Sequence, residues 1–454
     1  MRLYLWLMAW LSGPLRACSV FSSLWTTAML SAVPLTPARG LDLGSSGDRS
    51  DETVAYRERL RDYDNIKKYG AERVADRDRK MFLPEGLRAG NFLLFPSVGT
   101  ALVFNDNVLL TNQNRQADFR TEITPGFRIV SQFPRHAFDL SLGGKIVEHF
   151  EHSELDHVNA HIKAGAALHF DHAHTLAVSV LSRLDHSDQL DPFAPNFARQ
   201  LVPLVENRAS IGLTRDAGRL YGTISATVES LDFKDVVSRN GTVLDQDAAD
   251  MRTLSGELRV GYRFSPGYEA VGKVRGLRQW NRGNDALDRD AIGLEVLAGV
   301  SAESSPLLRW RILGGYGLRD FEQANVASVR TLLAEAEVQW LPTQTMTFYA
   351  TLRRAITDTQ EIQSTGIVET ALRTRLDYEI WHNVVMNFNA DFKDHEYLGS
   401  SRRDVIMVGR VGIDWYMSKN WLFNVSYEHL VRDSNQAEND LTRNLVMVGA
   451  KLSF

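Results

Sequence analysis

Beyond about residue 90 the chain alternates between apolar and polar residues with a period of two. Within residues 367–380, Leu372 and Leu376 alternate with Arg373 and Arg375. A period of two predicts β-strands that present different residues to their two faces. The polar face carries too many charges to be buried in a soluble core. We therefore predict strands with an apolar face toward lipid and a charged face toward a water-filled lumen.

The spacing of turn signals predicts how many strands there are. Short clusters of Pro, Gly, Asn, Asp and Ser, such as 216–218, 265–267 and 418–420, alternate with longer polar loops. Consecutive short clusters lie roughly forty residues apart, which leaves two strands of a dozen residues each rather than the four short strands of a propeller blade. The pattern predicts an all-β, antiparallel up-and-down transmembrane barrel of about eighteen strands, with sixteen as the alternative, and with short periplasmic turns and longer outer loops. Only the loops 187–202 and 234–248 are candidates for a constriction folded into the lumen.

The last strand carries the same pattern in its clearest form. Val446, Val448, Leu452 and Phe454 are apolar, and the residues between them are mostly small or polar. Taken alone, this stretch also fits an edge strand of a soluble sheet. In the context of the whole chain we expect it to pair with residues 91–105 and close the barrel, since closure removes the unpaired edges that an open sheet must protect.

The N-terminal part differs from the barrel. Residues 1–45 are apolar with few charges and are predicted to be a signal peptide, cleaved near residues 38–46. Residues 46–88 form a mixed-charge periplasmic segment, and residues 89–454 form the barrel. For the mixed-charge segment we favour a solvated linker, with a periplasmic tether or a gate under the pore as the alternatives.

Composition narrows the function. The net charge is −5 and 44% of the residues are hydrophobic, a balance that a barrel shares with soluble proteins because only alternate residues face lipid. A nucleic-acid-binding protein should be basic, so we expect no nucleic-acid partner. The single cysteine excludes a disulfide framework and a cysteine-based metal site.

No catalytic motif is present. The sequence contains neither G-x-S-x-G nor H-E-x-x-H. Histidines cluster at 149–161 and 169–174, where solvated histidines at the barrel rim explain them better than a metal site does. A triad assembled from distant strands is left open by the sequence. We predict that the protein is not an enzyme and has no catalytic residues, cofactor or metal.

The start of the barrel resembles a known family. Residues 74–79 (VADRDR), then 84–96 (PEGLRAGNFLLFP) and 104–108 (FNDNV), are similar to the Arg-rich stretch and following motifs of the putative β-barrel porin 2 family. Phe104 departs from the tyrosine usual in that family. The resemblance extends over about residues 70–454 and implies a protein of the Gram-negative outer membrane.

The resemblance also implies function and partners. Many members belong to exopolysaccharide systems, so it implies a conduit for export of a surface polysaccharide, with a periplasmic export partner. The alternative is a general diffusion porin for small, preferably anionic, solutes; an outer-membrane hydrolase is a third possibility. The expected partners are outer-membrane lipid and the barrel-assembly machinery. Similar barrels end in an aromatic strand that this machinery recognises, so Phe454 is the expected recognition signal.

The charged face supplies the predicted pore lining. A modest excess of basic residues there would favour anionic solutes, whereas pairing of charges across strands would serve mainly to keep the lumen wet. The predicted pore-lining residues are Arg120, Lys163, Arg208, Glu257, Arg259, Arg275, Arg309, Arg311, Glu335, Glu337, Arg353, Glu369, Arg373, Arg375, Asp377, Arg410, Asp414 and Lys451.

Overall fold

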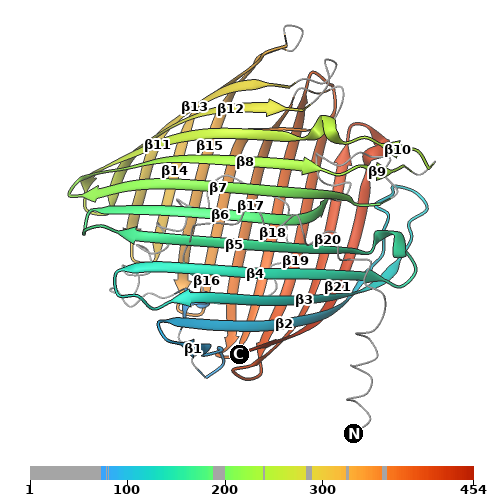
Figure 1. The fold of residues 1–454 in the computed structure, drawn as a ribbon, viewed down its shortest axis with the longest axis horizontal. Coiled ribbons are helices and arrows are strands. Elements are labelled where there is room, and N and C mark those ends of the chain that lie inside the picture. Colours follow the sequence, from blue (N-terminus) through green and yellow to red (C-terminus); the bar gives the residue numbers. More distant parts are fainter. Residues whose placement is uncertain are drawn as a thin grey trace. The chain divides into compact units, whose positions relative to one another are not determined.

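A computed structural model describes residues 73–77, 79, 81–187, 200–238, 241–282, 289–323, 327–359, 364 and 366–454. These residues form a closed antiparallel barrel of eighteen strands (Figure 1). The predicted fold class and strand number are therefore confirmed. Among the described residues no helix is both long and apolar enough to cross a membrane. The predicted signal peptide lies outside the described residues.

The elements follow one another in chain order. Their bounds are η2 Val74–Asp76, β1 Leu87–Ala89, β2 Phe92–Asn105, β3 Asp118–Ser131, β4 His136–His149, η3 Ser153–Leu155, β5 His157–His169, β6 His174–Ser187, β7 Val202–Ala217, β8 Leu220–Phe233, β9 Val236–Val237, β10 Val243–Leu244, η4 Asp247–Ala249, β11 Met251–Ser265, β12 Tyr268–Asn281, β13 Ala291–Ser305, β14 Leu308–Phe321, β15 Val329–Thr343, β16 Met346–Thr357, β17 Gly366–Trp381, β18 Val384–Leu398, β19 Arg403–Tyr416, β20 Trp421–Ser434, η5 Ala437–Asn439 and β21 Leu441–Ser453.

The first and last long strands close the wall. β2 pairs antiparallel with β21 from Ser97 opposite Ser453 to Asn105 opposite Leu445. Beyond the end of β21, the short strand β1 pairs with the start of β2. The backbone N–H of Phe454 donates to the carbonyl of Pro96 at 3.1 Å. The barrel sheet therefore has no long free edge.

The two faces of the strands differ as the alternation predicts. In β17 the apolar side chains of Leu372 and Tyr378 are both 39% exposed, whereas Asp377 between them in the alternation is 2% exposed. The exposed apolar side chains form the outer surface of the barrel. Near the short turns this surface is aromatic: the rings of Trp415 and Trp421 lie 5.6 and 6.0 Å from that of Phe423. Aromatic rings are favoured at the level of lipid headgroups.

Two turns show why glycine is needed at the short-turn rim. Gly218, between β7 and β8, has φ +66°, and Gly267, between β11 and β12, has φ +77°. Residues other than glycine rarely adopt this left-handed backbone conformation. The predicted turns at 216–218 and 265–267 are thus present, although β7 extends two residues into the first and β11 one residue into the second.

Candidate functional site: the inner face of the barrel

The register places every residue of the predicted pore lining on one face, opposite the exposed apolar side chains. Arg353 lies opposite Glu335 of β15, and Arg375 lies opposite Asn389 of β18. Alternate residues of a strand share a face, so Arg353 and Arg375 face the same way as the residues two positions before and after them. The same reasoning applies from Arg120 on β3 to Lys451 on β21.

Many of these charges are paired across strands. Arg183 and Arg208 both bind Glu206, at 2.6 and 2.9 Å. Arg208 also binds Glu229 of β8 at 3.0 Å. The result is a chain of alternating charges across β6, β7 and β8. Removing one partner from this chain would be costly, because the carboxylate of Glu206 is only 1% exposed and would stay buried without a counterion.

A second network lies on the last strands. Arg410 of β19 and Arg443 of β21 both bind Glu428 of β20, with 3.0 Å between Arg443 Nη2 and Glu428 Oε1. Sequence reasoning selected Arg410 and missed the other two residues. Both occupy alternate strand positions, so the same signal could have found them.

Other inward-facing charges were missed in the same way. The missed acidic residues include Asp139, Asp185, Glu229, Glu303, Asp391 and Glu428, and the missed basic residues include Arg319, Lys393, Arg432 and Arg443. With them included, acidic and basic residues are nearly equal in number on the inner face of the described strands. The wall as a whole therefore lacks the basic excess expected from the sequence.

A local basic group nevertheless lies on β16 and β17. Arg353, Arg373 and Arg375 face inward on these neighbouring strands. Glu335, which lies opposite Arg353 in register, binds Lys273 of β12 at 2.9 Å. The Nε of Arg373 has no hydrogen-bond partner among the described residues. Arg375 binds Asp377 at 2.8 Å, yet its side chain is 42% exposed.

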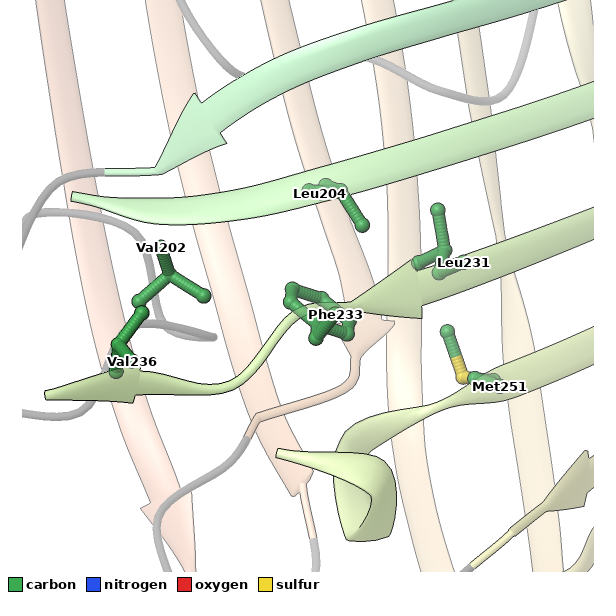
Figure 2. Packing of buried hydrophobic residues seen from close by; sticks show 6 residues of the cluster. All are labelled: Val202, Leu204, Leu231, Phe233, Val236 and Met251. Atoms are coloured by element: carbon green, nitrogen blue, oxygen red, sulfur yellow. The ribbon is translucent and has the colours of Figure 1, made fainter. Parts of the chain in front are cut away.

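At the outer mouth, loop residues pack against the inner wall. Val236, on β9 of the loop between β8 and β11, is 1% exposed. It belongs to a cluster of inward-facing apolar side chains from β7, β8 and β11 (Figure 2), namely Val202, Leu204, Leu231, Phe233 and Met251. One of the two loops predicted to form a constriction is thus anchored inside the mouth. Most of the other, 187–202, lies outside the described residues.

Two further loops make inward contacts at the same mouth. Leu110, between β2 and β3, is buried against Leu430 and Leu441 of the inner wall. Asp358, in the loop after β16, binds Arg319 of β14 at 2.5 Å and so reaches across β15. Each contact fixes a loop over the lumen rather than away from it.

At the short-turn mouth, the end of the mixed-charge segment packs into the barrel. Arg79 is 3% exposed and binds Glu379 of β17, and its Nε donates to the carbonyl of His382 at 3.0 Å. A hydrogen bond from the Lys419 ammonium lowers the pKa of Glu85 in the same segment. The expectation of a solvated linker is therefore wrong for the described residues 73–79.

The histidines at the outer rim hold the loops in place. His152 Nδ1 lies 3.0 Å from Asp118, and His149 Nδ1 lies 3.3 Å from Asp156. These histidines have carboxylate partners within the chain, so the expectation that they are simply solvated is wrong. A separate group of three exposed carboxylates, Asp235, Asp245 and Asp247, lies within 4.8 Å on the loop after β8. Exposed acidic groups of this kind are common without a metal, and we assign none.

The chain matches one known family and is similar to several solved structures. Residues 80–454 match the family described as putative beta-barrel porin 2. Similar solved structures include the outer membrane protein OpdK from Pseudomonas aeruginosa, with 12% identity, a TM-score of 0.43, and coverage of 80% of this chain and 99% of that chain.

Two other solved structures are similar to this chain. OccAB4 from Acinetobacter baumannii has 11% identity and a TM-score of 0.44, with coverage of 81% of this chain and 99% of that chain. A BenF-like porin from Pseudomonas fluorescens Pf-5 has 10% identity and a TM-score of 0.43, with coverage of 82% and 100%. No curated protein matches the sequence.

Proposed function

Because the chain belongs to the putative beta-barrel porin 2 family and is a porin-like channel of the Gram-negative outer membrane, we propose that it is a diffusion channel for small anionic solutes. An eighteen-stranded barrel is wide enough to enclose water. The charged inner face would keep that water in place. The inward-folded loops at the outer mouth favour small solutes over a polymer chain.

The group Arg353, Arg373 and Arg375 carries the preference for anions. Its three guanidinium groups project from the inner face of two adjacent strands. A ring or patch of arginines in a pore attracts anions and raises their local concentration. Carboxylates border this group as well, since Arg375 binds Asp377 at 2.8 Å and Asp391 lies opposite Arg373 in register. We propose that the three arginines, gathered on two neighbouring strands, set the selectivity.

Reversal potentials in a salt gradient across planar bilayers test the proposal. The wild-type channel should be anion-selective, and Arg353→Gln or Arg373→Gln should shift the reversal potential toward that of a non-selective pore. Arg354→Gln is the matched control, because Arg354 is the next residue but lies on the outer face with Thr370 and Glu396. Cation selectivity of the wild type, or equal shifts from Arg353→Gln and Arg354→Gln, would refute the proposal.

Export of a surface polysaccharide is the competing function implied by the family resemblance. Loss of capsule or slime in a deletion strain would favour export. Normal polysaccharide output, together with slower uptake of small anions, would support the diffusion channel.

A further inference from the structure

We propose that the described residues 73–77, 79 and 81–85, called the strap below, form a latch that narrows the short-turn mouth of the channel. The contacts of the strap are with inward-facing residues. Thr347 of β16 and Glu379 of β17 both lie on the inner face, opposite Asp377 and Val385 in register. A segment held by these residues occupies part of the lumen at that mouth.

Glu379 is the main anchor. Its carboxylate forms ion pairs with two strap residues. Oε2 pairs with Arg79, and Oε1 lies 2.9 Å from Arg77 Nη1. The carboxylate of Glu379 is 5% exposed and the Arg79 side chain 4% exposed. A buried guanidinium that loses its counterion is costly to retain. The position of Arg79 therefore depends on the charge of Glu379.

The remaining contacts define the bound geometry of the strap. The backbone N–H of Val74 donates to Thr347 Oγ1 at 2.9 Å, and Val74 is 1% exposed. Arg79 Nη1 donates to the carbonyl of Val74 at 2.5 Å, which ties the two ends of the first turn of the strap together. The Arg79 guanidinium also lies 5.9 Å from the centre of the Tyr416 ring. The contacts extend over β16, β17 and the end of β19, so the strap covers only one side of the mouth.

Few of these contacts are apolar, and most depend on charge. Such a segment can be released without unfolding the barrel, because no backbone ladder joins residues 73–79 to a strand among the described residues. Release would widen the mouth. Binding and release of the strap would then set the conductance, whatever solute the channel carries.

The test compares Glu379→Gln with Glu303→Gln. Glu303 is also an inward-facing carboxylate near the short turns, but its partner is Arg309 at 2.9 Å. Both variants remove one negative charge from the same rim, and only the first removes the anchor. Purified, folded barrels are treated with trypsin, and cleavage after Arg77 and Arg79 is followed by mass spectrometry. Single-channel conductance is recorded on the same preparations.

We expect Glu379→Gln to speed cleavage at Arg77 and Arg79 by roughly tenfold or more, and to raise conductance. Glu303→Gln should leave cleavage unchanged. Equal cleavage of the two variants would overturn the anchor. Faster cleavage at unchanged conductance would overturn the narrowing of the mouth.

A milder variant guards against misfolding of Glu379→Gln. Thr347→Val removes only the acceptor for the Val74 N–H in a side chain of similar size. It should speed cleavage by about fivefold, as the loss of one hydrogen bond predicts. If Thr347→Val folds normally and protects Arg77 and Arg79 as well as the wild type does, the strap is not held as we propose.

Discussion

Lys273 of β12 and Glu335 of β15 form an ion pair of 2.9 Å although two strands separate them. In a flat sheet their strands would be too far apart, since neighbouring strands are spaced by about 4.8 Å. Gly299 of β13 and Gly315 of β14 supply the reason. A Cβ on Gly315 would collide with the carbonyl oxygen of Val296. The wall therefore bends sharply around this point, with its concave side toward the lumen.

The pair covers an apolar cluster at the bend. Val271, Leu297, Leu313 and Leu333, from four successive strands, are each at most 4% exposed although they face inward. Water is thus excluded from one corner of an otherwise charged wall. The bend, the cluster and the ion pair are one structural unit.

Removing one partner of the pair should destabilise the barrel more than removing both. Lys273→Met removes the ammonium that binds Glu335 at 2.9 Å and Glu257 at 3.6 Å beside apolar side chains, and should cost about 2–4 kcal/mol. The double variant Lys273→Met/Glu335→Leu should recover most of that loss. Unfolding in urea of the barrel inserted in lipid vesicles measures the free energy of unfolding of the single and the double variant. Additive losses in the double variant would contradict the coupling.

Gly315→Ala should destabilise the bend by about 2 kcal/mol or more, because the new methyl group cannot be placed without separating β13 from β14. Gly314→Ala is the matched control: it is the adjacent residue, and nothing lies within 4 Å of a Cβ built there. The control should change stability by less than about 1 kcal/mol. The temperature at which each folded variant changes to the gel mobility of the unfolded protein measures its stability. Equal effects would show that β13 and β14 are not in close contact.

The loop after β8 should detach from the inner wall when its apolar anchor is made polar. Val236→Ser removes about 1.5 kcal/mol of burial and should speed tryptic cleavage after Lys234 roughly tenfold. Val237→Ser, at a side chain that is 36% exposed, should have little effect. Cleavage that is fast in the wild type would show that the loop is not anchored.

Phe454 should matter for assembly more than for the stability of the finished barrel. Its ring is 48% exposed and its N–H completes the pairing with β2. Deletion of Phe454 should lower the amount of folded protein in the outer membrane while export to the periplasm continues. Phe454→Trp should restore assembly, because the end of the strand remains aromatic. Normal insertion of the deletion variant would refute the role as an assembly signal.

The sequence was most informative where a rule of local geometry applied. The alternation of Leu372 with Arg373 indicated which face meets lipid, and the turn residues around Gly218 and Gly267 separated the strands correctly. The predicted pore lining also follows from alternation alone. The count of charges was less successful, because residues such as Asp391 and Glu428 were not assigned to the inner face.

Contacts between distant parts of the chain could not be foreseen in this way. Nothing in the mixed-charge segment marks Arg79 as the residue that inserts beside Glu379, three hundred positions away. Nor does the sequence indicate that Glu335 of β15 binds Lys273 of β12, across two intervening strands. A period of two and the chemistry of turns act within a strand or a hairpin, and they determined the two faces and the strands of this protein. Only the tertiary structure decided the ion-pair partners, the bend and the strap, because those depend on how far the closed wall curves back upon itself.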